Sequence, residues 1–301
     1  MPNIFNYLKH PEYVFRPQQV LRRLRRILKA PQQEEIIRLP WGARVKVRPN
    51  ENIGSDIFHY GIFDRVVPEA ICRLLDGNET AVEVGANIGQ NFSLMAFQTT
   101  PAGRAIAFEP HPEIFEELKN NSSLWPEKVR QNLRLENFAL GETTGEAWLT
   151  NGVEFEHNRG SAALARTSDN NLGFRVNLRT LDDYMQENDK IGVCKIDVEG
   201  HELSVLKGAE RTLSRHAIRD IIFEDFCPMM SPVALLLQAH HYRVFALVAG
   251  WWKPMLTEAS EGARRQKGFS FNYLATLDPE RAQKRFKAGG WHCLNYRRRP
   301  S

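Results

Sequence analysis

The segment at residues 81–89 restricts the fold of this chain more strongly than any other, because an apolar run there breaks into a turn with two glycines. The run predicts a buried strand, and a helix is expected from about Gln90. Gly85 and Gly89 suit a turn whose backbone takes dihedral angles that other residues avoid, or lies close to a ligand. A strand, a glycine turn and a helix in this order are typical of the carboxyl edge of an open α/β sheet, where nucleotides bind.

Further strands and helices alternate along the chain. Helices are expected at 66–75, after Pro112 and after Ser231. Alternation of this kind implies a mainly parallel sheet with helices on both faces. Residues 146–150 are expected to pair back on 133–140 as a β-hairpin. Seven apolar runs predict the core strands, at residues 81–84, 104–108, 133–140, 193–196, 220–223, 242–248 and 270–275.

The positive charge of the chain is concentrated at its N-terminus. The 301 residues include 40 Lys or Arg and 36 Asp or Glu, a net charge of +4. Residues 1–40 hold eight Lys or Arg against three Glu, so the body at 41–301 is close to neutral. A near-neutral body argues against a broad nucleic-acid-binding face. We therefore expect a basic extension at 1–40, a single domain at 41–301 and no nucleic-acid partner.

Residues 17–29 are expected to form an amphipathic helix within this extension. The preferred interpretation is that its apolar stripe packs on the main domain. The alternative is a contact with a membrane surface or a partner. That contact would use the arginines that lie off the stripe, at Arg22, Arg23, Arg25 and Arg26.

The cysteines and the apolar runs indicate the compartment. The four cysteines lie far apart without a Cys-x-x-Cys pair, so neither a zinc site nor a disulfide framework is expected. No apolar run has membrane-spanning length, and the N-terminus lacks the apolar core of a signal peptide. We expect a cytoplasmic protein.

Polar side chains follow the ends of successive predicted strands. Glu83 closes the first strand, and Glu109 closes the second 26 positions later, where a carboxylate can bond ribose hydroxyls. Asn137, Phe138 and Ala139 follow at the third, placed to border an adenine ring. The turn reads Gly-x-Asn-x-Gly and lacks the Gly-x-Gly-x-x-Gly pattern that holds a pyrophosphate. A ligand with ribose and adenine but no phosphate fits better, and S-adenosylmethionine is the expected cofactor.

Three candidate proton acceptors follow the fourth predicted strand, namely Asp197, Glu199 and His201. Methyl transfer to a hydroxyl needs the oxygen in line with the methyl group and a base for the proton. The sequence leaves the choice among them open. A divalent metal site is a second interpretation of this region, because Asp197, Glu224 and Asp225 could supply hard oxygen ligands. The favoured interpretation is a helix cap with a solvent-facing pair.

Four ordered motifs resemble those of the FkbM-family methyltransferases. The resemblance covers about residues 41–275 and implies a Rossmann-like class I methyltransferase fold with a seven-stranded, mostly parallel sheet. It also implies use of S-adenosylmethionine and, usually, O-methylation of a hydroxyl on a sugar, glycoconjugate or polyketide-type metabolite. Loops such as 151–173 and 249–268 would select the acceptor. The motifs are EVGANIG at 83–89, FEP at 108–110, TLDDY at 180–184 and KIDVEGHE at 195–202.

The resemblance places the methionine and ribose end of the cofactor at the glycine turn and the ribose hydroxyls at Glu109. Two alternatives remain, a non-catalytic adenosine-ligand-binding partner subunit and a nucleic-acid methyltransferase. The second is disfavoured, because no Asn/Asp-Pro-Pro-Tyr turn follows the fourth strand. The expected cofactor-binding set is Glu83, Gly85, Ala86, Asn87, Gly89, Glu109, Pro110, Asn137, Phe138 and Ala139.

Overall fold

The computed structural model describes residues 11–16, 33–150, 163–165, 173–226, 231–260 and 268–296. The basic helix expected at 17–29 lies outside the described residues, and so do its arginines Arg22, Arg23, Arg25 and Arg26. Most of the polar loop expected at 151–173 lies outside them as well.

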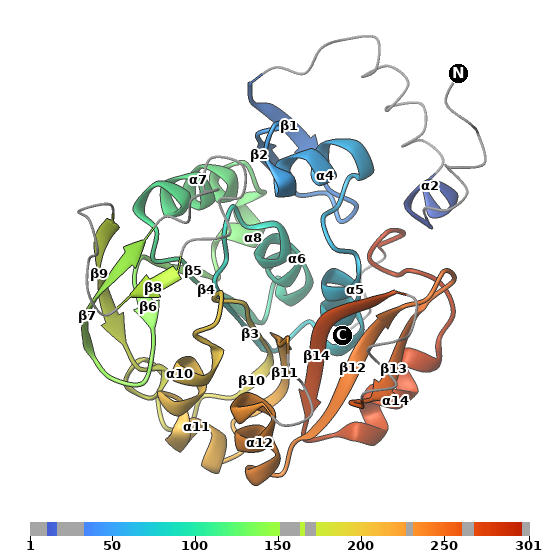
Figure 1. Ribbon diagram of the computed structural model, residues 1–301. Helices are drawn as coiled ribbons and strands as arrows, with labels where there is room; N and C mark the ends of the chain where they lie inside the picture. Colours follow the sequence, from blue (N-terminus) through green and yellow to red (C-terminus); the bar gives the residue numbers. More distant parts are fainter. Residues whose placement is uncertain are drawn as a thin grey trace.

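A central eight-stranded sheet organises the described part of the chain, in the order β13-β12-β14-β11-β10-β3-β4-β5 (Figure 1). The strands from β5 to β11 are parallel neighbours, whereas β14, β12 and β13 pair antiparallel. The expected α/β fold with a mostly parallel sheet is therefore confirmed. The strands are β3 (Thr80–Val84), β4 (Arg104–Phe108), β5 (Leu133–Glu136), β10 (Ile191–Ile196), β11 (Ile218–Glu224), β12 (Arg243–Ala249), β13 (Pro254–Glu258) and β14 (Phe269–Thr276).

The sheet contains the seven expected strands and one more, β13. This segment lies within the loop that we expected at 249–268. β13 pairs only with β12 and forms the edge of the sheet. Its first residue, Pro254, has no backbone N–H to donate, and an edge strand tolerates such a residue. The proline made this segment look like a loop in the sequence, although a proline is compatible with a strand at the edge of a sheet.

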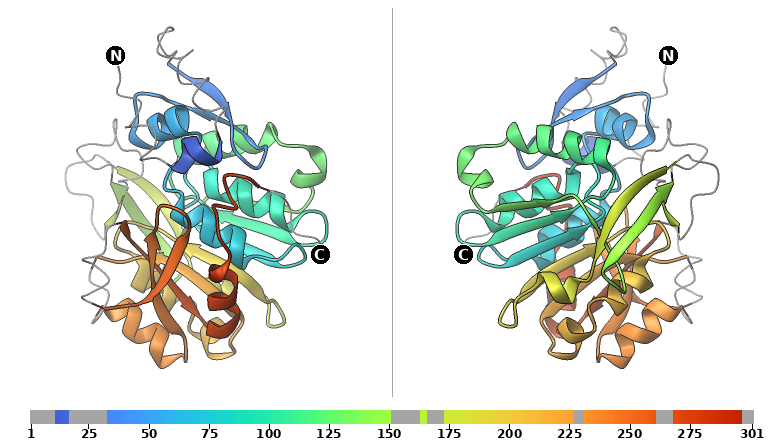
Figure 2. Two further views of the ribbon diagram at one scale, coloured as in Figure 1. Left: turned by 90° about the vertical axis from the view of Figure 1, so that its right-hand side faces the viewer. Right: turned by 90° about the vertical axis from the view of Figure 1, so that its left-hand side faces the viewer.

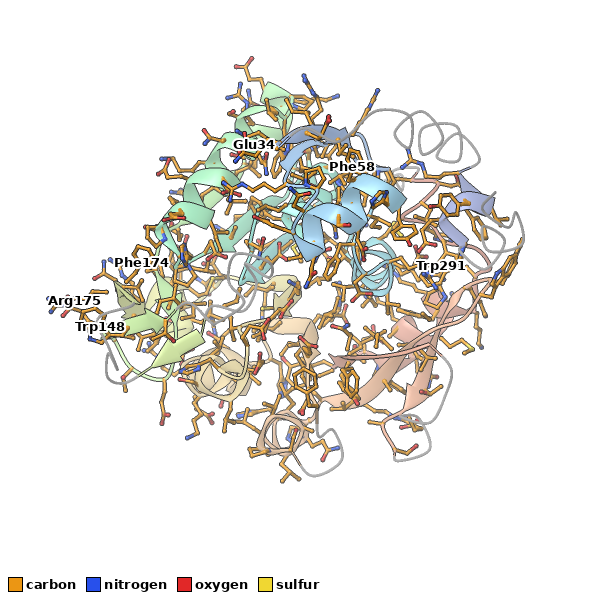
Figure 3. All side chains as sticks on the ribbon, turned by 45° about the horizontal axis from the view of Figure 1, so that its top comes forward. Glu34, Phe58, Trp148, Phe174, Arg175 and Trp291 are labelled. Atoms are coloured by element: carbon orange, nitrogen blue, oxygen red, sulfur yellow. The ribbon has the colours of Figure 1, made fainter. Side chains whose placement is uncertain are left out.

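A separate four-stranded sheet, in the order β6-β9-β7-β8, replaces the expected hairpin. The predicted pairing of 146–150 with 133–140 is wrong, because β7 pairs with β9 and β8 instead. Trp148 and Arg175 are register partners in this sheet (Figure 3). The third core strand ends at Glu136, since Phe138 turns into the core against Phe108. The strands are β6 (Ala139–Leu140), β7 (Gly145–Thr150), β8 (Ala163–Ala165) and β9 (Gly173–Arg179).

Two hydrophobic clusters lie on opposite faces of the central sheet, because side chains alternate along each strand. One contains Ala81 and Val193 and is covered by α5 (Val66–Leu74), α6 (Gln90–Thr99) and α14 (Pro279–Lys287). The other contains Val82 and Cys194. The expected helices on both faces are confirmed. The helices on the second face include α9 (Leu181–Tyr184), α10 (Glu202–Lys207), α11 (Glu210–Ser214) and α12 (Pro232–Ala239).

A small hairpin of β1 (Glu35–Arg38) and β2 (Arg44–Val47) precedes α4 (Asn52–Tyr60). The hairpin and α4 lie together at one end of the molecule, next to α7 (Pro112–Ser123) (Figure 2). Its pairing crosses the division that we expected between residues 40 and 41, and Ile37 belongs to the main core. Two short helices complete the described elements, α2 (Pro11–Phe15) and α8 (Glu127–Arg130).

The C-terminal segment packs back on α5 through a buried ion pair. Arg73 and Glu69 are both fully buried, and their side chains meet at 2.7 Å. Arg73 also donates to the carbonyl oxygens of Arg285 at 2.7 Å and Gly290 at 2.8 Å, while Glu69 accepts from the backbone N–H of Cys293. The pair thereby joins α5 to residues more than 200 positions away. Among the described helices, none has the length and apolar character needed to cross a membrane.

Candidate active site

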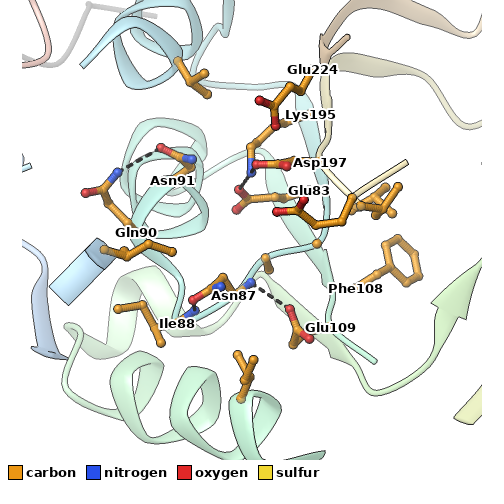
Figure 4. Close-up of a pocket in the computed structure, with 18 of the residues that line it drawn as sticks. Glu83, Asn87, Ile88, Gln90, Asn91, Phe108, Glu109, Lys195, Asp197 and Glu224 are labelled. Atoms are coloured by element: carbon orange, nitrogen blue, oxygen red, sulfur yellow. Dashed lines mark hydrogen bonds and ion pairs between the residues drawn. The ribbon is translucent and has the colours of Figure 1, made fainter. Parts of the chain in front are cut away.

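A pocket of about 510 Å³ opens at the carboxyl ends of β3, β4, β10 and β11. This volume is in the range of small-molecule sites. Its described lining includes one positively charged side chain, Lys195, against six carboxyl groups. Such a lining attracts a ligand that carries positive charge. The six are Asp64, Glu83, Glu109, Asp197, Glu199 and Glu224, of which Figure 4 labels Glu83, Glu109, Asp197 and Glu224.

Strand register explains why several of these side chains converge. Glu83 pairs in register with Lys195, and Lys195 pairs with Ile222, which lies two positions before Glu224. Asp197 follows Lys195 by two positions, and Glu224 pairs with Asn272. Alternate residues share a face of a sheet, so all five side chains lie on one face. That face is the one covered by α5 and α6.

Lys195 forms the centre of the site. Its ammonium lies 3.0 Å from Glu83 Oε1 and 3.1 Å from Asp197 Oδ2. Burial alone would lower the pKa of Lys195, but the carboxylates Asp197 and Glu83 outweigh it and hold the pKa above its usual value. Lys195 is therefore a charged link between the two carboxylates. Its role was not predicted from the sequence, although a lysine inside an otherwise apolar strand is a usable signal.

The glycine turn after β3 takes the conformation that the sequence predicts. Gly85 has φ +81°, and a Cβ there would lie 2.0 Å from the carbonyl oxygen of Asp197. Gly89 has φ +91°, and a Cβ there would lie 2.6 Å from Leu118. Asn87 also has positive φ, which asparagine tolerates better than most residues. The turn thus lets β3, β10 and α7 approach closely around the pocket, which Gly85, Ala86 and Asn87 line.

Glu109 is buried at the end of β4 and bonds to the glycine turn. Its Oε2 accepts from the Asn87 N–H at 2.8 Å, and its Oε1 accepts from the His111 N–H at 3.0 Å. Burial raises the pKa of Glu109 to about 7, although both backbone hydrogen bonds lower it. Each carboxylate oxygen has a second lone pair, so the group can still accept from ribose hydroxyls.

Asn137 does not line the pocket, in contrast to Pro110, Phe138 and Ala139. Its side-chain amide donates to the carbonyl oxygens of Glu109 at 2.8 Å and Pro110 at 3.2 Å. Asn137 therefore positions the backbone that carries Glu109. Phe138 and Ala139 form an apolar wall on the side where the sequence analysis expects the adenine ring.

The three candidate bases differ in their position relative to the pocket. Asp197 and Glu199 line the pocket, whereas His201 is not among the lining residues and stands at the start of α10. The backbone of Glu199 is left-handed, with φ +51°. The helix-capping role considered for one carboxylate is not seen, because the start of α10 has no side-chain cap hydrogen bond and Glu202 accepts from the Gly200 N–H before the helix, at 3.2 Å.

The metal interpretation finds no support among the described residues. Glu224 lines the pocket near Asp197, but Asp225 is not a lining residue, because alternation turns it to the other face of the sheet. No group of three or more His, Cys, Asp or Glu side chains within the described ranges could hold a metal ion.

Two further lining residues, Asn272 and Gln90, were not among the predicted site residues. Asn272 on β14 donates to Asp64 Oδ2 at 3.0 Å, across 208 positions of sequence. Gln90 bonds to both the N–H and the C=O of Phe63, the residue before Asp64. These contacts hold the loop between α4 and α5 over the sheet edge. A contact over such a separation leaves no local signal in the sequence.

The residues present fit S-adenosylmethionine. Glu83 is buried, and its Oε2 has no hydrogen-bond partner among the described residues. An unpaired buried carboxylate oxygen is costly, and an ammonium group such as that of the methionine moiety would satisfy it. Glu109 is placed for ribose hydroxyls, and the apolar wall is placed for the adenine ring.

Comparisons with known proteins agree with this geometry. Residues 83–244 match the family model of the methyltransferase FkbM domain. Methyltransferase sdnD of Sordaria araneosa is 27% identical over 185 residues, which cover 51% of this chain and 69% of that protein. Hexuronic acid methyltransferase AglP of Haloferax volcanii is 29% identical over 145 residues, 48% of this chain and only 56% of that protein.

A solved S-adenosylmethionine-dependent O-methyltransferase from Thermotoga maritima aligns with 84% of this chain and 80% of its own, at 11% identity and a TM-score of 0.39. The FkbM match spans more than half of the chain and includes Glu83, Glu109 and Asp197. The chain therefore belongs to the FkbM methyltransferase family and is an S-adenosylmethionine-dependent methyltransferase.

Proposed function

We propose that this methyltransferase transfers the methyl group to a hydroxyl oxygen of a sugar, glycoconjugate or polyketide-type metabolite. The observation that supports this most is the continuity of the pocket. It leads from Glu109 past Glu83 and Lys195 to the carboxyl groups of Asp197 and Glu199. The first part suits the donor, and the second offers proton acceptors beside it, which a hydroxyl nucleophile requires.

Each residue has a defined task in this proposal. S-adenosylmethionine supplies the electrophilic methyl group when it is bound. Glu83 accepts from its ammonium group, and Glu109 accepts from its ribose hydroxyls. Lys195 forms ion pairs with Glu83 and Asp197 and so fixes both side chains. The base is a carboxyl group on the acceptor side, where Asp197 and Glu199 lie and His201 does not.

The charge of the pocket also restricts the acceptor. Lys195 is the one described lining residue with positive charge, and its ammonium is already shared between two carboxylates. An acceptor with its own carboxylate beside the reacting hydroxyl would meet like charges at short range. We therefore propose an acceptor that is neutral there, in contrast to the hexuronic acid in the name of the Haloferax volcanii relative.

Calorimetry with S-adenosylmethionine tests the donor site. Wild type should bind, and Glu109→Ala should bind roughly ten- to a hundredfold more weakly, because hydrogen bonds to a charged group contribute about 1.5–3 kcal/mol. Glu116→Ala is the matched control, since Glu116 is exposed on α7 and pairs only with Lys119 among the described residues. Equal binding by the two variants would contradict the assignment of Glu109.

Mass spectrometry of acceptor pools tests the reaction through the gain of one methyl group. A matched pair, methyl glucoside and methyl glucuronide, differs in charge at one carbon. Neutral glycosides are expected to be methylated and their uronate counterparts to react much more slowly. Donor binding with no transfer to any hydroxyl acceptor would favour the non-catalytic partner subunit instead.

A further inference from the structure

Glu224 stands at the acceptor end of the pocket with its carboxyl group uncommitted. It is the last residue of β11, between the strand that leads to Asp197 and the strand that carries Asn272. Its side chain lines the pocket, yet it makes no hydrogen bond or ion pair with any described residue. The Asn272 amide does not hold it, because that amide donates to Asp64 and to the Ser270 carbonyl, both at 3.0 Å.

Most other carboxyl groups of the pocket are already engaged. Lys195 holds Asp197 and Glu83, and two backbone N–H groups hold Glu109. Carboxylate oxygens that already accept these bonds have fewer lone pairs left for an acceptor hydroxyl. Glu199 is the remaining competitor, and its side chain comes from a loop, whereas Glu224 is fixed on a central strand. Rigid elements hold a reacting group more accurately than loops do.

The surroundings also give Glu224 a suitable proton affinity. Burial raises the pKa of Glu224 to about 7, with further contributions from four carboxylates that face it. These are Asp197 beyond the end of β10, Glu199 in the next loop, Glu202 on α10 and Asp64 before α5. A general base is most effective when its pKa lies near the operating pH.

We infer that Glu224 is the general base that takes the proton of the acceptor hydroxyl. The inference rests on the proposed function. The hydroxyl oxygen attacks the methyl carbon and forms the new C–O bond, while the methyl–sulfur bond breaks. The electron pair of that bond stays on sulfur, which becomes a neutral thioether, and the hydroxyl proton passes to the Glu224 carboxylate. Asp197 and Lys195 then act as positioning residues beside it.

Glu224→Gln in the full chain tests this role, with tritiated methyl transfer from S-adenosylmethionine to methyl glycosides as the readout. The variant is expected to lose about 10²- to 10⁴-fold in kcat, the usual contribution of a general base. Donor affinity should change less than twofold. With S-adenosylmethionine saturating, so that the titration of Glu109 does not contribute, kcat/KM of the wild type for the acceptor should rise tenfold per pH unit below pH 7 and level off above it. Glu224→Asp should keep that inflection at a lower rate, and Glu224→Gln should lose it.

Glu258→Gln is the control, because Glu258 is exposed on the edge strand and pairs with Arg243, and neither residue lines the pocket. This variant should have the same kcat and the same pH dependence of kcat/KM as the wild type. If Glu199→Gln abolished the inflection and Glu224→Gln kept it, Glu199 would be the base and the inference would be overturned.

A measurement without acceptor separates this inference from the proposed function. The infrared carboxyl band that is present in wild type and absent in Glu224→Gln should titrate near pH 7. Titration near pH 4.5 would overturn the role of Glu224, whether or not any glycoside is methylated. Failure of wild type to methylate any hydroxyl would overturn the proposed function, and the role of Glu224 with it.

Discussion

Glu109 is a buried carboxyl group whose protonation is linked to ligand binding. Its pKa is raised to about 7, so neutral and ionised forms coexist near physiological pH. Ribose hydroxyls donate hydrogen bonds, and the ionised form accepts at both oxygens, whereas the protonated form must itself donate one hydrogen. Binding of S-adenosylmethionine therefore favours the ionised form and lowers the pKa of Glu109.

Donor binding is thus expected to release protons below and around pH 7. Affinity should rise with pH up to about 7 and level off above it. Calorimetry in buffers of different ionisation enthalpy measures the number released. The variant Glu109→Gln should release fewer protons, and since Glu224 is present in both proteins, the difference isolates the share of Glu109. Equal release by wild type and variant would refute the linkage.

Single site residues were predictable where they follow an apolar run. Glu109 and Asp197 do so, Glu83 is the last residue but one of β3, and all three line the pocket. Lys195 was missed because it lies inside the run and looks like part of a strand. Asn137 and His201 stand near the correct strand ends, but the direction of a side chain in a loop depends on backbone angles that the sequence does not reveal.

At the scale of elements, the β3–turn–α6 unit joins the fold to the cofactor site. Gly85 is important for both the fold and the site, because it has positive φ and the Asp197 carbonyl approaches it closely. A side chain at this position would strain the turn and push β10 away from β3. Both donor and acceptor sides of the pocket depend on that approach.

Gly85→Ala is therefore expected to lower the free energy of unfolding by roughly 2–3 kcal/mol, from left-handed strain and the clash together. Urea denaturation measures the change. Gly145→Ala is the control, since a Cβ at Gly145 meets no atom within 4 Å, and it should change stability by less than about 1 kcal/mol. Similar losses in both variants would show that the close approach at Gly85 is not what matters.

The elements of the central sheet were predictable because each of the seven runs is apolar and bounded by turn residues. The four-stranded sheet was not, because β7 has no partner near in sequence. Its main partner is β9, with Trp148 opposite Arg175. Pairing between distant segments depends on the whole fold. The failure to predict β13 has a local cause, because Pro254 at its start is a residue that usually argues against a strand.

At the scale of the whole molecule, the buried pair of Arg73 and Glu69 closes the chain on itself. It connects α5, which begins two residues after Asp64, to α14 and the segment that follows it. No sequence pattern predicts this closure, because the distant partners of Arg73 are backbone carbonyls.

Arg73→Met should cost about 3–5 kcal/mol of unfolding free energy, because removal of one partner leaves a buried charge unpaired. Arg243→Met removes an exposed ion pair with Glu258 and should cost no more than about 1 kcal/mol. Chemical denaturation of both variants gives the comparison. Equal costs would mean that the buried pair does not hold the C-terminal segment.

The six carboxyl groups around one lysine have a consequence for turnover. The pocket attracts the donor through the positive charge on its sulfur, and methyl transfer removes that same charge. The spent cofactor, S-adenosylhomocysteine, is then held by fewer electrostatic contacts than the donor that replaces it. Inhibition by S-adenosylhomocysteine should accordingly be weak, since methyl transfer removes the positive charge that attracted the donor to the carboxyl groups.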